Sequence, residues 1–271
     1  MTRRPGYWIG HPGALLPLPD RFGTLTRKTE RAAVYKTSAS GRRRAYVAAR
    51  RAPLREWQVM LPRLRPDEAS ALHGLLMYTD PPYVWVDGWA RATNLLEPSV
   101  VGLLDSMPML SPLGRQPLDG GGWAATAGAN PSGGVVNLPP APVVSGEPVA
   151  VSAYLGASGN ATVSAVFLDS AGAQVGSAET SAAVTGLDVL RRAYVTSDVP
   201  AAAAAVAIRI AGASIIAQPA VTWTPDVVEF GPGGGATQVL VTGVDENVLW
   251  AMLTADGSRQ ADLSFTVTEV G

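Results

Sequence analysis

The sequence contains no cysteine, and only two of its 271 residues are histidines. The missing thiols exclude disulfide bonds, thiolate metal sites and cysteine nucleophiles, but they do not fix the compartment. The two histidines, His11 and His73, share no spacing with carboxylates that would indicate a metal site. The GxSxG, HExxH and Walker patterns are missing as well. We therefore expect no cofactor, no metal ion and no enzymatic activity.

Charge is scarce, and its distribution is uneven. Charged residues make up 16% of the chain, and the formal net charge is −1, which gives no global argument for nucleic-acid binding. Residues 1–65 hold 15 of the 21 lysines and arginines but three of the 22 acids, so they carry +12 and the remainder carries −13. Such a chain can stack its positive surface on a negative neighbour, and a solvated basic face is the alternative.

Long apolar runs are also absent. The most apolar stretch, residues 199–218, is alanine-rich and carries Arg209, which makes it a poor membrane span. Prolines cut the apolar part of the N-terminus into short pieces, and no clean cleavage site follows them, unlike a signal peptide. We expect a soluble protein that is intracellular when made and does not insert into a membrane.

The residues that are abundant favour a mainly β fold. Gly (29) and Pro (22) are frequent beside many valines, threonines and alanines, which indicates many short strands and turns. In the N-terminal part, Trp57, Val59 and Leu61 alternate as in a strand, and residues 38–44 read as a turn. The segment 65–78 is the one clear helix, with Pro66 at its first position and an apolar stripe along one face.

The middle of the chain reads as a sandwich or jelly roll. From Val149 short alternating strands follow one another at roughly ten-residue spacing. The sequences ASGNA, at 157–161, and SAGAQVG, at 170–176, predict turns between them. The alanine run 201–205 predicts a turn that enters a strand. The glycine-rich segment 231–238 lacks the Lys-Ser/Thr ending of a phosphate loop, so a flexible hairpin loop is the better interpretation.

Composition changes near residues 94 and 225, which predicts one domain interrupted by another. The framework would comprise residues 1–93 and 226–271 as a split β-barrel or sandwich, and the inserted β-sandwich would comprise residues 94–225. The aromatic stretch before the first junction contains Tyr83, Trp85 and Trp89. We expect these three side chains to pack the framework around a hairpin-like Asp87-Gly88 turn.

Aromatic side chains are the leading candidates for a binding site, because the apolar face of a sugar ring matches a flat aromatic surface. Tyr154 and Trp223 lie in alternating apolar strands, which favours a place in the core. Trp123 follows three glycines and suits either role. The candidate carbohydrate-binding residues are Trp123, Tyr154 and Tyr194.

Two further clusters have less specific interpretations. Arg42, Arg43 and Arg44, flanked by tyrosines, could contact nucleic acid, but a charged loop at a protein interface explains them equally, and we assign them to an assembly interface. Carboxylate pairs can hydrolyse glycosidic bonds. However, Asp169, Asp188 and Asp198 each stand beside turn residues, so turn chemistry explains them.

Several phrases of the chain resemble a known family. The order of REWQVMLPRL, a short helix, PPYVWVDGWARATNLLEP and a terminal LSFTVTEVG resembles the minor tail proteins of long-tailed phages of actinobacteria, the distal-tail-protein group in particular. The middle segment is similar to jelly-roll carbohydrate-binding modules, through Asn94-Leu95-Leu96, Gly122-Trp123 and the closing AVTWTP. It departs from these modules in lacking the usual Phe-Glu of the opening strand and in having few exposed-type aromatics.

The resemblance implies a structural protein of the virion, located at the tail tip and made in the host cytoplasm. Distal tail proteins form rings, usually hexameric, that join the tail tube protein to the hub and tip proteins. The implied partners are therefore copies of the same chain and these tail proteins, without nucleic acid. The insert would be a candidate for contact with host cell-wall glycan, and the alternative function is a carbohydrate-binding adhesin.

Overall fold

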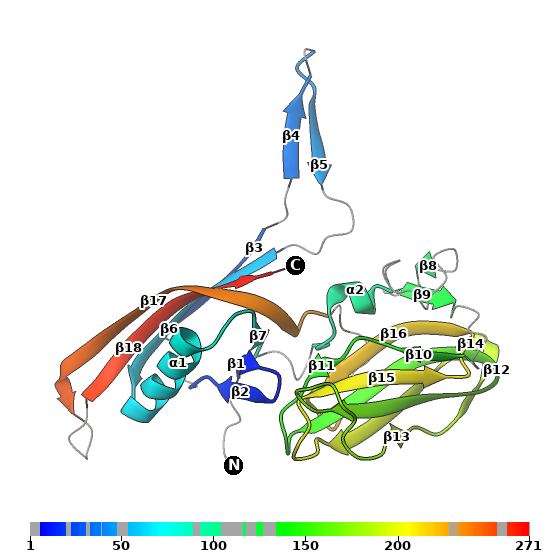
Figure 1. Ribbon diagram of the computed structural model, residues 1–271. Helices are drawn as coiled ribbons and strands as arrows, with labels where there is room; N and C mark the ends of the chain where they lie inside the picture. The colour runs from blue at the N-terminus through cyan, green and yellow to red at the C-terminus, as the bar shows by residue number, and fades with distance from the viewer. Residues whose placement is uncertain are drawn as a thin grey trace. The chain divides into compact units, whose positions relative to one another are not determined.

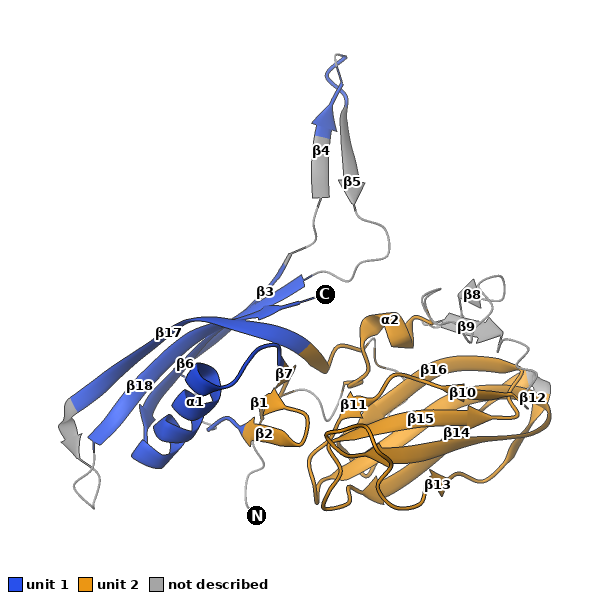
Figure 2. Ribbon diagram, viewed as in Figure 1, with its two compact units in different colours: residues 1–5, 17–83, 238–271 blue, residues 6–16, 84–237 orange. Residues whose placement is uncertain are grey.

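The chain is described here by a computed structural model, which covers residues 6–19, 23–30, 33–38, 40–47, 54–88, 93–103, 116–117, 123–126, 134–227, 231, 233–253 and 259–270. The chain divides into two compact units (Figure 2). Unit 1 comprises residues 1–5, 17–83 and 238–271, and unit 2 comprises residues 6–16 and 84–237. Residues 6–16 and 84–93 thus group with unit 2. The domain boundaries predicted at 93/94 and 225/226 stay predictions.

Strands dominate both units, which confirms the mainly β fold class (Figure 1). Unit 1 contains, apart from a few end residues, β3 (Thr24–Glu30), β4 (Ala33–Thr37), β5 (Arg43–Val47), β6 (Leu54–Leu64), α1 (Pro66–Tyr78), β17 (Ala236–Leu253) and β18 (Arg259–Glu269). Unit 2 contains β1 (Trp8–His11), β2 (Ala14–Pro17), β7 (Tyr83–Val86), α2 (Pro98–Val101), β8 (Gln116–Pro117), β9 (Trp123–Thr126), β10 (Val135–Asn137), β11 (Ala141–Pro142), β12 (Pro148–Leu168), β13 (Glu179–Thr180), β14 (Val184–Asp198), β15 (Ala205–Ala211) and β16 (Ile215–Thr222).

The strands of unit 1 follow the order β17-β18-β6-β3 with antiparallel neighbours, and the strand order of the same sheet continues from β17 to β7. Its apolar face is set by alternation along β6, where Trp57, Val59 and Leu61 are buried as predicted. Phe265 and Val267 of β18 pair with Val59 and Trp57 and are buried too. Helix α1 packs on β18 (Figure 1).

Helix α1 confirms the predicted helix and its start. Pro66 occupies the first turn, and the backbone N–H of Arg65 donates to Glu68 Oε2 at 2.9 Å, which satisfies one N–H at the helix start. Leu72 and Leu75 are buried on the inner side. After the helix ends, the Tyr83 hydroxyl donates to the Thr79 carbonyl at 2.8 Å.

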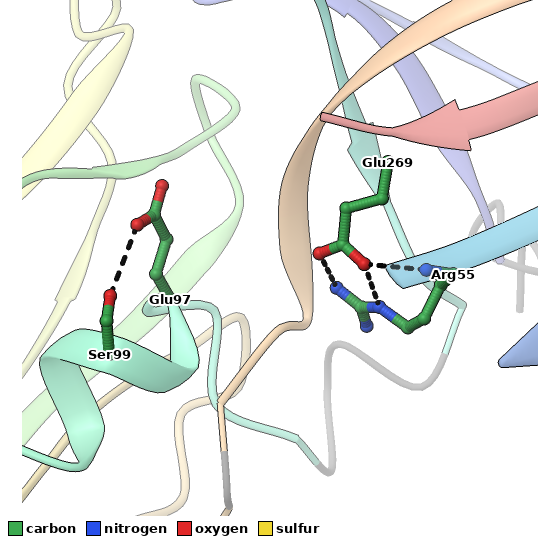
Figure 3. A network of polar contacts seen from close by, with 4 residues as sticks. All are labelled: Arg55, Glu97, Ser99 and Glu269. Atoms are coloured by element: carbon green, nitrogen blue, oxygen red, sulfur yellow. Dashed lines mark hydrogen bonds and ion pairs between the residues drawn. The ribbon is translucent and has the colours of Figure 1, made fainter. Parts of the chain in front are cut away.

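A fork of hydrogen bonds joins the beginning of β6 to the end of β18 (Figure 3). Arg55 Nε donates to Glu269 Oε2 at 3.0 Å, and Arg55 Nη2 donates to Glu269 Oε1 at 2.9 Å. The backbone N–H of Arg55 also donates to Glu269 Oε2 at 2.9 Å. Both side chains are mostly buried, at 14% and 10% exposure. The carboxylate therefore fixes the C-terminal end of the sheet through three charge-assisted bonds.

Strands β4 and β5 form a two-stranded sheet of their own in unit 1. The predicted turn between them is confirmed, because the backbone N–H of Ser38 donates to the Arg42 carbonyl at 2.9 Å. Gly41 closes the turn at φ +77°, a conformation that glycine adopts without steric cost.

Unit 2 is a sandwich of two sheets that share β12 (Figure 1). One sheet has the order β14-β12-β16-β9-β8 and uses the first half of β12. The other places β10, β11, β15 and β13 around the second half of β12. The turn predicted at 157–161 is therefore wrong: β12 continues through it, and its register shifts where it leaves one sheet for the other. The turn after β12 and the strand entered at Ala205 are confirmed.

One hydrophobic core lies between the two sheets. Every second residue of β12 points into it, as do the apolar residues of β15 and β16, because successive side chains of a strand alternate between faces. The core side chains of these strands are Val149, Val151, Ala153, Leu155, Val163, Ala165, Phe167, Val206, Ile208, Ile210, Ile216 and Val221.

The glycine-rich segment is not the flexible hairpin loop that the sequence predicts. Gly234 N–H donates to the Leu96 carbonyl at 2.7 Å, and Gly235 N–H donates to the Asn94 carbonyl at 2.9 Å. A Cβ on Gly233 would meet Leu96 O at 2.7 Å and Val101 Cγ2 at 2.9 Å. The glycines are needed because two backbone segments approach each other too closely for side chains.

The buried side chain of Asn94 holds this region together. Its Nδ2 donates to the Pro219 carbonyl at 2.6 Å, and its Oδ1 accepts from the backbone N–H groups of Val221 at 3.0 Å and Leu96 at 3.2 Å. Asn94 is 1% exposed. The Asn-Leu-Leu phrase is thus a structural clamp on β16.

The aromatic stretch is partly as predicted. Tyr83 and Trp85 are buried, whereas Trp89 lies outside the described residues. Strand β7 pairs with β1 through Trp85 and Ile9 and is also a neighbour of β17, so its described partners are distant segments and not a strand across the Asp87-Gly88 turn. Trp85 packs on Tyr7 with ring centroids 5.5 Å apart.

Candidate ligand-binding face

The strongest candidate site is on the outer face of the sheet β14-β12-β16 in unit 2. Ser152 and Tyr154 of β12 lie directly opposite Tyr194 and Arg192 of β14, respectively. Residues opposite each other in antiparallel strands point to the same face, so the four side chains form one cluster. We name these four residues the tyrosine–arginine face.

The sequence places these side chains outward because their neighbours are core residues. Val151, Ala153 and Leu155 of β12 are almost fully buried in the sandwich, and Ala193 and Val195 of β14 are buried beside them. With a period of two, the residues between them must face away from that core.

Two residues of β12, Ser152 and Tyr154, hold the side chain of Arg192 in place. Its guanidinium carbon lies 5.3 Å from the centroid of the Tyr154 ring, and its Nη2 donates to Ser152 Oγ at 3.1 Å. A guanidinium at this distance is attracted to the aromatic face, and the hydrogen bond restricts its rotation. Ser152 is 2% exposed, so the anchor is buried while Arg192 is half-buried.

Tyr194 supplies the accessible surface of the cluster. Its side chain is 55% exposed, while Tyr154 is half-buried under Arg192. An exposed tyrosine ring beside a positioned guanidinium can stack on an apolar ring and donate hydrogen bonds to oxygen atoms at its edge. Such an arrangement is chemically suited to holding a ligand, and its four residues include no carboxylate.

The structure brings together two of the three predicted carbohydrate-binding residues, Tyr154 and Tyr194. The core position expected for Tyr154 is wrong, since its ring is half-buried on the outer face. Trp123 lies on β9 of the same sheet, beyond β16, and its side chain is outside the described residues. Trp223 is a core residue as expected, 5% exposed, and its Nε1 donates to the Pro142 carbonyl at 3.2 Å.

The predicted assembly cluster is in unit 1, in the turn between β4 and β5 and at the start of β5. Arg42 is exposed in the turn between β4 and β5. Arg43 and Arg44 begin β5, where they pair with Thr37 and Lys36. The side chains of Arg43 and Arg44 lie outside the described residues, and the interface assignment stays a prediction.

Sequence reasoning missed Arg192 and Ser152. The information that could have found them is the spacing of two that separates Arg192 from Tyr194, and Ser152 from Tyr154. What the sequence could not supply is the register between β12 and β14, which pairs Tyr154 with Arg192 across 38 positions of the chain (192 − 154).

A hollow in unit 1 lies between α1 and the strands β17 and β18 and has a volume of about 440 Å³. His73 Nδ1 lies 3.3 Å from Glu246 Oε2 inside it, and Ser70 and Arg259 also line it. Within the described part of the chain, His73 makes no hydrogen bond to a hydroxyl group, so the pair has no activated nucleophile.

The aspartates considered for glycoside hydrolysis have other positions. Asp169 Oδ1 accepts from the backbone N–H groups of Ala171 and Ala173 at 2.9 and 2.8 Å, which makes it a turn residue. Asp198 ends β14, and the side chain of Asp188 is outside the described residues. Among the described residues, no three histidines, aspartates or glutamates are grouped to hold a metal ion, and no helix is long and apolar enough to cross a membrane.

No protein-family model matches the chain, and no curated protein matches it. Among solved structures, the enzymatically active domain of tailspike protein 4 of bacteriophage CBA120 is 11% identical at a TM-score of 0.29; the match covers 74% of this chain and 20% of that one. The CBM22-1-GH10 modules of the Clostridium thermocellum N-terminal endo-1,4-beta-D-xylanase 10B, complexed with xylohexaose, are 15% identical at a TM-score of 0.29, over 42% of this chain and 24% of that one.

The T13 IBDV viral particle also matches, at 14% identity and a TM-score of 0.23, over 98% of this chain and 66% of that one. The chain thus spans about a fifth to a quarter of the first two structures. This chain is weakly similar to a phage tailspike domain and to a protein with a carbohydrate-binding module, and neither similarity assigns it an activity.

Proposed function

We propose that the protein is a non-enzymatic structural component of a phage tail tip, in which copies of unit 1 join head to tail into a closed ring. The ring would connect the tail tube to the tip complex. The observation that carries the proposal is the difference in charge between two strands of the sheet in unit 1, β3 and β17.

Strand β3 is the last strand of its sheet, and β17 lies between β18 and the four-residue β7, which can cover only part of the eighteen residues of β17. Arg27 and Lys28 are exposed on β3, whereas Asp245 and Glu246 are exposed on β17. A terminal strand, or the part of a strand that its neighbour does not cover, has backbone groups that can pair with another chain. A basic strand of one copy and an acidic strand of the next would therefore attract each other while like strands repel.

The direction of the strands also suits a head-to-tail contact. Each neighbour in β17-β18-β6-β3 is antiparallel, so β3 and β17 run in opposite directions. Placing β3 of one copy beside β17 of the next continues the antiparallel pattern. A heterologous contact of this kind closes into a ring when the rotation between copies divides a full turn.

Labelling of virions tests the location. Gold-labelled antibodies against this chain should bind at the tail tip in electron micrographs of intact particles. Purified tails that lack the chain, or labels spread along the tube or on the capsid, would overturn the proposal.

The second candidate function is glycan binding, and the tyrosine–arginine face favours it. In this function unit 2 would contact the host cell wall, and many weak sites on a ring would give useful avidity. Retention of the full chain on purified cell-wall polysaccharide, lost in the Tyr194→Ala variant, would support it. Equal retention of the variant, or none for the original chain, would exclude this face as the glycan site.

A further inference from the structure

From the order of charges along β3 and β17, we infer the register in which neighbouring copies pair. Residues 24–28 of one copy lie antiparallel to residues 245–249 of the next, with Lys28 opposite Asp245 and Arg27 opposite Glu246. The inference rests on the ring proposed above and adds to it the residue pairs of the contact.

Both segments have a free backbone edge in the described part of the chain. Strand β3 is the last strand of its sheet, so its edge away from β6 is unpaired there. On the side of β17 away from β18, the neighbour is the four-residue β7. The backbone N–H of Asp87, directly after β7, donates to the Gly235 carbonyl at 2.8 Å, directly before β17 begins. Strand β7 therefore lies beside the first residues of β17 and leaves residues 245–249 able to accept another strand.

Strand β3 presents one basic side chain to each face of the sheet. Arg27 pairs with the buried Trp57 of β6 and so lies on the face that carries the core. Lys28 pairs with Glu56 and lies on the opposite, open face. Both basic side chains are exposed, and an acid at the free edge would add to the contacts that they make within their own chain.

Strand β17 presents one acidic side chain to each face. Glu246 pairs with the buried Leu263 of β18 and lines the hollow beside α1, next to His73. Asp245 pairs with Ser264 and lies on the open face. When β3 of one copy extends the sheet beside β17 of the next, each face receives one basic and one acidic side chain.

One antiparallel register satisfies both faces at once. From Lys28 to Arg27 the chain steps back one residue, and from Asp245 to Glu246 it steps forward one residue, as opposite residues do in an antiparallel pair. The register that opposes Lys28 to Asp245 therefore also opposes Arg27 to Glu246. A slip by two residues in either direction removes both charge pairs, and a slip by one moves the side chains to the other face.

The same register also matches two apolar side chains. Leu25 lies two residues from Arg27 on the core-side face of β3, is half-buried and falls opposite Val248 of the next copy. Val248 is 39% exposed and lines the hollow of about 440 Å³ beside α1. Contact between the two side chains removes apolar surface of both from water. The hollow is therefore the place where the core-side residues of the neighbouring β3 fit.

Cysteine cross-linking tests the register directly, because the chain has no cysteine of its own. Thr26→Cys and Asn247→Cys in one chain place thiols directly opposite each other between copies, with Cα atoms about 5 Å apart, within the reach of a disulfide. Within one chain the two positions are three strand spacings apart, about 14 Å, too far for a disulfide. Under oxidation we expect a ladder of bands at multiples of 28.1 kDa, which reductant returns to 28.1 kDa.

Two matched pairs of uncharged positions on the same face test the registers slipped by two residues. They are Thr24→Cys with Asn247→Cys and Thr26→Cys with Leu249→Cys, and both should give weaker ladders, since their thiols would be diagonal neighbours. Under reducing conditions each variant should have the solution mass of the original chain, which checks folding and assembly.

A ladder that is strongest for one of the slipped pairs would overturn the register but leave the pairing of β3 with β17 intact. No ladder from any pair, in a protein that still forms a closed oligomer, would overturn the pairing of these strands. No ladder from a protein that is monomeric at every concentration would overturn the ring as well.

Discussion

The side chain of Asn94 shows how much a single buried amide can hold. It bonds Pro219, Val221 and Leu96 together and is 1% exposed. Replacing it with alanine would leave a carbonyl and two backbone N–H groups buried without these partners. Each such group costs about 1–3 kcal/mol.

We therefore predict that Asn94→Ala lowers the free energy of unfolding of unit 2 by about 3 kcal/mol. Urea unfolding followed by tryptophan fluorescence measures it. Asn160→Ala is the control, because Asn160 is exposed on β12 and should change the stability by less than about 0.5 kcal/mol. Equal losses in the two variants would contradict the clamp.

The Arg55–Glu269 fork gives a second prediction at this scale. Glu269→Gln keeps the shape of the side chain but removes the charge that three N–H groups face. We expect unit 1 to lose about 2 kcal/mol, the usual strength of hydrogen bonds to a charged group. The exposed Asp80→Asn is the control. A Glu269→Gln variant as stable as this control in urea unfolding would show that the fork contributes nothing.

Residue patterns predicted many local features, because these depend on residues that are close together in the sequence. Pro66 and the leucines of α1 indicated the helix correctly, and the alternation of Trp57, Val59 and Leu61 indicated β6. The place of Tyr154 was missed, because an apolar strand of small residues does not reveal which face carries the core. That depends on the register with β14, a contact distant in sequence.

At the scale of elements, the glycine-rich segment before β17 packs closely against the backbone at Leu96. Its composition alone suggests a flexible loop instead. Gly233 and Gly172 both have positive φ, +86° and +81°. A Cβ on Gly233 would meet Leu96 O at 2.7 Å, whereas a Cβ on Gly172 would meet nothing within 4 Å. Comparing alanine substitutions at the two positions therefore separates the cost of the positive φ from the cost of a steric clash.

We predict that Gly233→Ala destabilises unit 2 by at least about 1 kcal/mol more than Gly172→Ala, since both carry the cost of positive φ but only one has a clash. Thermal melting of the two variants side by side measures the difference. Equal melting temperatures would mean that the segment 231–235 is free to move away from Leu96.

Strand β12 was divided wrongly by the sequence reasoning for a physical reason. Gly159 and Asn160 are turn-forming residues, but here they lie where β12 passes between the two sheets, and the registers on either side shift. Small polar residues permit a strand to bend as well as to turn. Only the pairing of both halves with different partners distinguishes the two outcomes.

At the scale of the whole molecule, the basic and acidic parts of the sequence contribute different strands to the sheet of unit 1. Most of the basic excess lies in residues 1–65, and β3 belongs to this part, whereas β17 belongs to the acidic remainder. The sequence could predict this polarity. It could not predict that β3 is the last strand of the sheet and that β6 and β18 separate it from β17, which follows from the strand order.

This arrangement predicts a charge swap. Lys28→Glu should weaken self-association by placing an acid opposite the acidic strand of the next copy, and Asp245→Lys in the same chain should restore it. Association at increasing salt, followed by sedimentation velocity, measures both effects, and the original contact should weaken as salt screens it. We expect the double variant to associate as the original chain does. A double variant that associates more weakly than either single variant would contradict the pairing of β3 with β17.

The mass of the purified full-length protein in solution tests the central claim most directly. We expect one closed oligomer of fixed mass, a whole multiple of the 28.1 kDa chain, with rings visible in negative-stain electron microscopy. A 28.1 kDa monomer at every concentration, from a protein that is also missing from purified tails, would contradict the ring.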